Sequence, residues 1–95
     1  MRSFSGWKHP VSPLHFEAFL NATVNADPGS DKGLDWEELF GLYVSWCLLT
    51  GRLPEPAKAL RRALRQRGIT PGKNTLAMTG QAARDYIVAS APSLL

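Results

Sequence analysis

The amino-acid sequence predicts a small, mostly α-helical domain of the α+β class, with one short β-hairpin and an added helix near its C-terminal end. Three observations predict it. Apolar residues recur at helical spacing in four segments, most of which end at glycine or proline. A turn-forming run, Pro71-Gly72-Lys73-Asn74, separates two short segments of hairpin character. The 95 residues, 44% of them hydrophobic, are enough for one core and not for two.

The chain is expected to consist of an irregular arm over residues 1–12, a single folded domain over 13–91 and a tail over 92–95. It contains one cysteine, which excludes an internal disulfide framework and indicates a reducing compartment. It has no apolar run long enough to cross a bilayer and no signal-peptide pattern. We therefore expect a cytoplasmic protein that does not enter a membrane.

The first helix is predicted over Pro13–Ala26. Ser12 can accept a hydrogen bond from an amide of the first turn, and Pro13 fits that turn without losing a needed donor. Phe16, Phe19 and Leu20 follow at helical spacing. A turn cluster that begins with Asp-Pro-Gly then ends the helix.

The second helix has the clearest start in the chain. Asp35 and Glu38 have the spacing of a capping box, and Leu34 and Leu39 occupy the positions of a hydrophobic staple. Gly51 ends the helix, because glycine adopts the left-handed conformation that closes a helix C-terminus. Most of its circumference is apolar, which is typical of a central core helix. The apolar positions are Trp36, Leu39, Phe40, Leu42, Tyr43, Trp46, Cys47 and Leu49.

The third helix follows the connection 52–56 and ends near Arg67, where Gly68 stops it and Ile69 is placed to fold back on the last turn. At 100° per residue, four cations fall within an arc of about 100°, and the leucines cluster away from them. These cations, called here the basic stripe, are Lys58, Arg61, Arg62 and Arg65. Because no acid lies between positions 56 and 85, no local carboxylate can pair with them.

The hairpin is expected to pair residues 69–70 with 75–78 and to carry Lys73 and Asn74 at its tip. A fourth helix is predicted over Thr79–Ala91, although Tyr-Ile-Val at 86–88 is also compatible with a strand.

Charge is distributed unevenly along the chain. The total is +3, but residues 1–47 carry three basic and six acidic side chains, and residues 48–95 carry eight basic and two acidic ones. The halves therefore have net charges of −3 and +6. An anionic partner is expected at the basic half.

A basic helix that follows another helix across a short connection and precedes a hairpin is the pattern of a winged helix-turn-helix. We expect a double-stranded-DNA-binding protein, a transcriptional regulator or a replication or mobile-element accessory factor. The expected DNA contacts are Lys58, Arg61, Arg62, Arg65, Lys73 and Asn74. The alternative is a winged-helix protein-interaction module without DNA binding, whose acidic half meets a basic partner. Single-strand or RNA binding has less support because few aromatic residues are expected to be exposed.

The segment 35–69 contains a Tyr-x-x-Trp-Cys helix at Tyr43–Cys47, a Gly-Pro turn after it and a Leu-x-x-Arg-Gly helix end at Leu64–Gly68. In these motifs it resembles the winged-helix module at the C-terminus of phage and plasmid primase-helicases and in stand-alone mobile-element DNA-binding proteins. The resemblance implies that the basic stripe faces DNA and that Lys73 belongs to the wing. The sequence departs from the family after Gly72, where an aromatic strand is usual and this chain has a helical pattern.

The C-terminal helix is expected to form a homodimer through Tyr86 and Ile87, so that two recognition helices meet DNA about 34 Å apart. No enzyme site, metal site, cofactor or small-molecule ligand is predicted. His9 and His15 lack further ligands at metal-binding spacing. Cys47 lies on the apolar stripe of the second helix, where a structural cysteine is expected.

Overall fold

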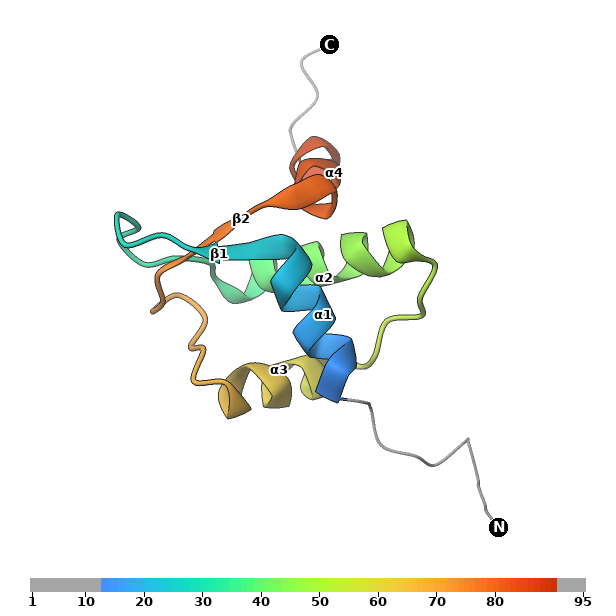
Figure 1. Ribbon diagram of the computed structural model, residues 1–95, viewed down its shortest axis with the longest axis horizontal. Helices are drawn as coiled ribbons and strands as arrows, with labels where there is room; N and C mark the ends of the chain where they lie inside the picture. Colours follow the sequence, from blue (N-terminus) through green and yellow to red (C-terminus); the bar gives the residue numbers. More distant parts are fainter. Residues whose placement is uncertain (1–12, 91–95) are drawn as a thin grey trace.

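The structure, a computed structural model, describes residues 13–90. The predicted arm, the tail and the Ser12 cap lie outside the described residues. Four helices and a two-stranded antiparallel sheet make up the fold (Figure 1), which confirms the mostly α-helical prediction. The elements are α1 (Pro13–Thr23), β1 (Val24–Ala26), α2 (Trp36–Thr50), α3 (Ala57–Gln66), β2 (Leu76–Met78) and α4 (Gly80–Ser90).

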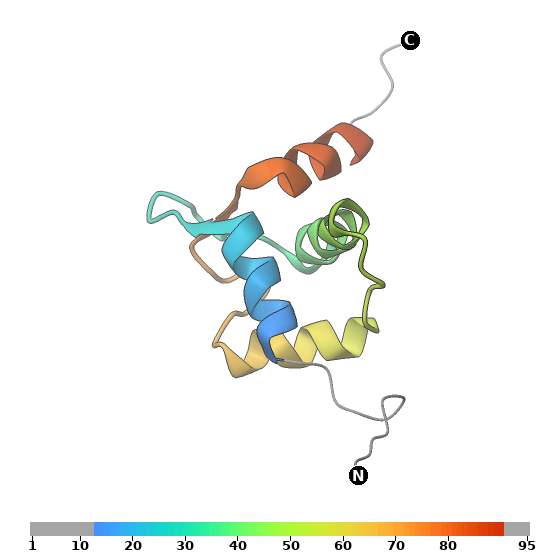
Figure 2. The same cartoon turned by 45° about the vertical axis from the view of Figure 1, so that its right-hand side comes forward.

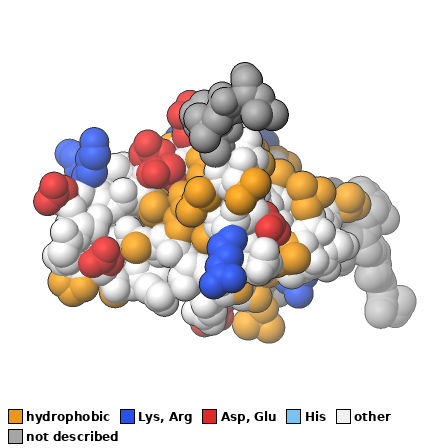
Figure 3. Space-filling view, turned by 90° about the horizontal axis from the view of Figure 1, so that it is seen from above, with side chains coloured by type: hydrophobic (Ala, Val, Ile, Leu, Met, Phe, Trp, Pro, Cys, Tyr) orange, Lys and Arg blue, Asp and Glu red, His pale blue; other side chains and the backbone are white. Residues whose placement is uncertain are grey.

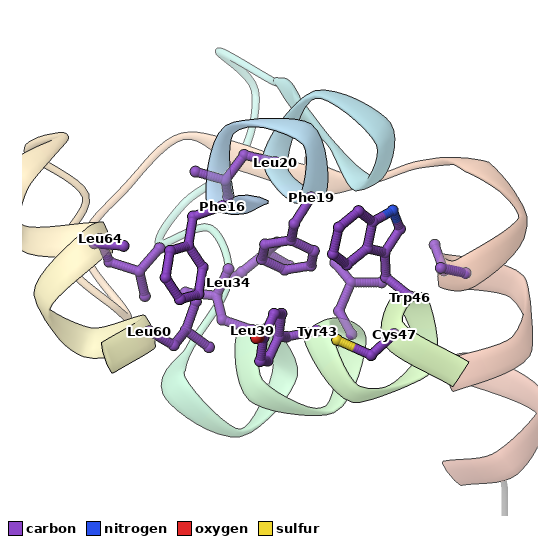
Figure 4. Close-up of a cluster of buried hydrophobic side chains, with 14 residues drawn as sticks. Phe16, Phe19, Leu20, Leu34, Leu39, Tyr43, Trp46, Cys47, Leu60 and Leu64 are labelled. Atoms are coloured by element: carbon purple, nitrogen blue, oxygen red, sulfur yellow. The ribbon is translucent and has the colours of Figure 1, made fainter. Parts of the chain in front are cut away.

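The core is built around α2, as its apolar circumference predicts. Leu39, Leu42, Tyr43 and Cys47 are fully buried, and Phe19 of α1 packs edge-on against the Tyr43 ring. Figure 4 shows how aromatic rings of α1 and α2 meet the leucines of α3 in one cluster. The buried face of α2 is narrower than predicted at its C-terminal end. Leu49, predicted to belong to the apolar face, is exposed.

Both ends of α2 form as predicted. Asp35 Oδ1 accepts from the Glu38 backbone N–H at 2.8 Å, and Glu38 Oε1 accepts from the Asp35 N–H at 2.9 Å, so the capping box is complete. Gly51 has a φ of 71°, and its N–H bonds back to the last turn. Local chemistry thus fixes the limits of the longest helix.

The first helix is shorter than predicted. It ends at Thr23, and the next three residues form β1 instead of the last helical turn. β1 pairs with β2 in antiparallel register, with Val24 opposite Met78, and Thr79 N–H donates to Thr23 C=O at 2.7 Å. The distant strand β2 supplies hydrogen bonds that compete with continuation of the helix, an effect that helical periodicity cannot reveal.

The predicted hairpin is wrong in its pairing. Residues 76–78 pair with β1, and in place of a strand ladder the two arms of the 71–74 turn share an isolated bridge between Thr70 and Lys73. An isolated two-stranded hairpin is marginal in water, whereas the pairing with β1 places half-buried Leu76 and Met78 against the core. The projecting wing expected from the sequence is therefore reduced to a tight turn.

The ends of α3 and the fourth helix follow the predictions closely. Ile69 N–H donates to Leu64 C=O at 2.9 Å and Gly68 N–H to Arg65 C=O at 3.0 Å, with Gly68 at a φ of 72°. α4 is helical over Gly80–Ser90, which excludes a strand at 86–88. Figures 1 and 2 place α3 and α4 on opposite sides of α1 and α2.

None of the helices in the described part of the chain is both long enough and apolar enough to cross a membrane.

Candidate nucleic-acid interface

The basic stripe lies on the outer face of α3. Lys58, Arg61, Arg62 and Arg65 are all exposed, as the helical wheel predicts. On the opposite face Leu60, Ala63 and Leu64 are buried, and Figure 4 shows the two leucines pointing toward Phe16 of α1. The helix is thus fixed to the core by one side and carries its cations on the other.

The four cations are not neutralised by any residue in the described part of the chain. None of them makes an ion pair with any residue in the range 13–90. α3 has no acidic residue in its first turn, and within the helix the stripe adjoins only alanine, leucine and glutamine. Four positive charges on a helix of ten residues repel one another, and an anion placed along the stripe relieves that repulsion.

The N-terminal end of α3 adds backbone donors beside Lys58. Its N-cap is Pro56, which has no side-chain capping bond, and the first hydrogen bonds of the helix come from the N–H groups of Ala59 and Leu60. The preceding N–H groups, those of Ala57 and Lys58, have no bond to another described residue. Such amides suit a phosphate oxygen, because they add to the positive end of the helix dipole.

Within residues 13–90, Arg61 is the one cation of the basic stripe that has an aromatic partner. Its guanidinium carbon lies 3.9 Å from the centroid of the Trp36 ring, a cation–π contact. Trp36 is in turn stacked on Phe40, with ring centroids 5.5 Å apart. A guanidinium that contacts a ring through its face keeps the N–H groups of its edge available for hydrogen bonds.

Sequence reasoning missed the role of Trp36. Its spacing in α2 predicted a core residue, but its side chain is only half-buried and supports Arg61. The two residues are 25 positions apart, so no local pattern connects them. The sequence shows an aromatic residue in the first turn of one helix and an arginine in the following helix. This pattern by itself does not predict that the two side chains are in contact.

A shallow depression of about 220 Å³ lies beside the C-terminal half of the stripe. Arg61 and Arg65 line one side, and the segment from Gly68 to Pro71 lines the other, with the Thr70 side chain exposed there. Two guanidinium groups and a hydroxyl at one depression can donate hydrogen bonds to a phosphate or to the acceptor edge of a base.

The two predicted wing residues have different placements. Lys73 is exposed, and its N–H donates to Thr70 C=O at 3.0 Å, so it extends the positive surface beyond α3. Asn74 has its amide occupied within the protein. Its Oδ1 accepts from the N–H groups of Leu34 and Leu76, and its Nδ2 donates to Leu34 C=O and Thr70 C=O.

The bonds of Asn74 argue against the predicted DNA contact at this residue. Each bond lies between 2.8 and 3.1 Å, and together they use both lone pairs and both protons of the amide. Its side chain holds the loop before α2 to the turn before β2. We therefore assign Asn74 a structural role and leave it out of the interface.

The two residues predicted for a dimer contact also differ. The Tyr86 ring lies over Gly41 of α2, where a Cβ atom would stand 2.2 Å from a ring carbon. Much of its surface is thus used in packing α4 on α2. Ile87 is 56% exposed and remains available to a partner.

Cys47, predicted to be structural, lies in the core, and His15 lies beside it. His15 Nε2 and the Tyr43 hydroxyl are 2.7 Å apart, and that hydroxyl accepts from the Glu55 N–H at 2.8 Å. Burial lowers the pKa of His15 and raises the pKa of the Cys47 thiol. The thiol is fully buried and stays protonated, in contrast to the exposed thiolate of a nucleophilic cysteine. Across residues 13–90, no three His, Cys, Asp or Glu side chains are grouped to hold a metal ion.

Comparison with known proteins gives no relative for this chain: no protein-family model, curated protein or solved structure matches it. The resemblance to the winged-helix module of primase-helicases therefore stays a prediction from the motifs.

Proposed function

We propose that the protein binds double-stranded DNA through the basic stripe of α3. The observation that carries the proposal is the combination of four exposed cations, none of them paired within the described chain, with a buried apolar face that fixes the same helix to the core. An α-helix with its side chains is about 10–12 Å across, which fits the major groove of B-DNA, about 12 Å wide. At 1.5 Å per residue, the ten residues of α3 extend for about 15 Å along such a groove.

In the proposed complex each part of the stripe has a separate task. Lys58, beside the uncapped amides at the start of α3, contacts a backbone phosphate. Arg61 and Arg65 reach the groove from the side lined by Thr70, where guanidinium groups bridge guanine acceptors or clamp a phosphate. Arg62 contacts the opposite strand, and Lys73 contributes a further phosphate contact from the turn.

The fold that accompanies this function is a winged helix-turn-helix with a shortened wing. α2 and α3 form the helix pair, joined by residues 51–56, and the turn closed by the bridge between Thr70 and Lys73 takes the place of the wing. Such a protein makes its base contacts through one helix, and few residues outside that helix contact DNA. A regulator or an accessory factor of replication or mobile elements fits this arrangement.

The test is a titration of labelled duplex DNA, followed by fluorescence anisotropy, at several salt concentrations. The logarithm of the binding constant is expected to fall linearly with the logarithm of salt, and each of Lys58→Ala, Arg62→Ala and Arg65→Ala is expected to flatten the slope by about 0.9. Arg84→Ala is the matched control, because Arg84 is exposed on α4, on the other side of the molecule. Binding that ignores salt, or that responds equally to Arg84→Ala, contradicts the proposal.

The alternative, a protein-interaction module that uses the acidic half, predicts a different result. Asp27, Asp31, Asp35 and Glu37 are exposed around the loop that precedes α2. The double variant Arg61→Glu, Arg62→Glu removes DNA binding under the proposal and leaves a complex with a basic partner intact under the alternative.

A further inference from the structure

A groove of about 530 Å³ lies between α4, β2 and the loop that leads into α2. Leu76 and Met78 of β2 form one wall, and Tyr86 and Ile87 of α4 form another. Glu38 also lines the groove, and one oxygen of its carboxylate accepts from the Asp35 N–H in the capping box. The groove is open and mainly apolar. One of its walls is α4, which lies on the opposite side of α1 and α2 from α3, the helix that carries the basic stripe (Figure 1).

The outer face of α4 carries an apolar ridge next to this groove. Ile87 is 56% exposed and Val88 is 76% exposed. Figure 3, which looks onto the α4 side, shows hydrophobic side chains over the middle of this face, with acidic and basic ones among them. A ridge beside a groove on the same face is the shape that two identical surfaces need in order to fit each other around a two-fold axis.

The charges on this face also favour contact between two copies of the chain. Arg84 is exposed on α4, about one turn before the ridge, and is the only cation of that helix. The acid beside it, Asp85, accepts a hydrogen bond from the Gln81 side chain at 2.9 Å. On the groove side the acids outnumber the bases: besides Glu38, exposed Asp31 and Asp35 directly follow groove-lining residues in the chain, and one exposed cation, Lys32, lies between them. When the ridge of one copy enters the groove of another, Arg84 approaches carboxylates of the second copy.

We infer that α4 and this groove form an isologous interface between two copies of the chain. Ile87 and Val88 of each copy enter the groove of the other, against Leu76 and Met78, and Arg84 faces Glu38 of the second copy. Tyr86, expected from the sequence to be a contact, acts as a wall of the groove because its ring is held on Gly41.

The position of this interface changes what a dimer does with DNA. α3 lies on the opposite side of the molecule from α4, so a two-fold contact through α4 directs the two basic stripes away from each other. They then contact two separate duplexes, in place of two half-sites about 34 Å apart on one duplex. This step rests on the proposed DNA binding, whereas the α4 interface itself does not.

Two experiments test the interface directly. Light scattering over a wide concentration range is expected to show a mass that rises from 10.4 kDa to twice that value. Ile87→Asp is expected to raise the dimer dissociation constant by about tenfold or more, since a charge then enters an apolar groove. Leu53→Asp is the matched control: Leu53 is 88% exposed on the connection before α3 and lies outside the interface. Circular dichroism and urea titration verify that both variants fold.

Cross-linking gives a positive test. Single variants Leu76→Cys and Ile87→Cys, mixed and oxidised, are expected to form a disulfide between copies, and Leu53→Cys mixed with Leu76→Cys is not. A chain that stays monomeric, or a dimer that persists in Ile87→Asp without this cross-link, overturns the inference. A chain that stays monomeric and binds a basic peptide through its groove residues also overturns the inference, and it assigns the groove to another protein.

The bridging step is measured by capture of a second, labelled duplex on a duplex already immobilised with the protein. Capture is expected with the unsubstituted chain and lost in Ile87→Asp, which still binds the first duplex. A dimer that binds no duplex refutes the proposed function and leaves the interface standing. A dimer that binds one duplex only refutes the bridging.

Discussion

Replacement of Trp36 by leucine tests whether the contact between Trp36 and Arg61 prepares the arginine for DNA. Arg61 is exposed, and its guanidinium carbon is 3.9 Å from the ring centroid. A cation–π contact at an exposed site contributes about 0.5–1 kcal/mol, and ordering an otherwise mobile side chain on binding costs about 0.5–1.5 kcal/mol. Because part of that ordering is already present in the unbound protein, Trp36→Leu is expected to weaken duplex binding about two- to fivefold.

The assay is a double-mutant cycle by fluorescence anisotropy with Trp36→Leu, Arg61→Ala and the double variant. Trp36 itself is expected to matter only through Arg61, so Trp36→Leu in the Arg61→Ala background should change affinity by less than about twofold. Trp36→Phe keeps an aromatic face and is expected to restore most of the loss. Urea titrations of each variant allow affinity to be compared per folded molecule, since loss of the stacking on Phe40 also lowers stability.

Two results would refute this reasoning. If Trp36→Leu weakens binding equally with and without Arg61, the ring contacts DNA by itself or acts through the fold. If Trp36→Phe is no better than Trp36→Leu, the aromatic face is irrelevant to the arginine.

Three further predictions concern stability, each measured by urea unfolding. Burial lowers the pKa of His15 in the folded state below its ordinary 6.5, so the unfolded chain binds more protons near that pH. The stability contributed by neutral His15 is therefore present above pH 6.5 and falls as pH decreases through the folded-state pKa. His15→Gln is expected to flatten this pH dependence of stability, and an unchanged profile contradicts the prediction. Asn74→Ala leaves backbone groups such as those of Leu34 without partners and is expected to lower the free energy of unfolding by about 1–3 kcal/mol, with DNA affinity per folded molecule unchanged. A stable variant that has lost affinity would return Asn74 to the interface. Gly41→Ala places a Cβ within 2.2 Å of the Tyr86 ring and is expected to lower the free energy of unfolding by about 1–3 kcal/mol. Tyr86→Ala in that background should remove most of the clash, and a Gly41→Ala variant of unchanged stability would show that α4 can shift freely.

The elements that sequence reasoning placed well are those decided by neighbours a few residues apart. The capping box of Asp35, the glycine that closes α2 and the reversal at Gly68 all depend on bonds that span about one helical turn. The outward basic face of α3 belongs to the same class, because helical periodicity alone sets which side chains share a face. These features needed no knowledge of the rest of the fold.

The errors lie where distant segments compete for the same backbone groups. Residues 24–26 leave the helical pattern because β2, about fifty residues later, offers them a strand partner, and the expected hairpin gives up its own strand to that pairing. Asn74 was placed at the tip of a wing from turn chemistry, but its amide is used by Leu34, forty residues away. Local propensity is a weak prior when tertiary hydrogen bonds are available to replace it.

The sequence by itself determined that this protein has a short helix with an apolar side and four cations on the other, because a period of 3.6 residues and the absence of nearby acids are local properties. Tertiary structure alone decided what surrounds that helix. It set Trp36 under Arg61, left a turn where a hairpin was expected and placed α4 on the opposite side from α3. Each of these results depends on contacts between residues that are far apart in the chain, and those contacts form only when the whole core packs.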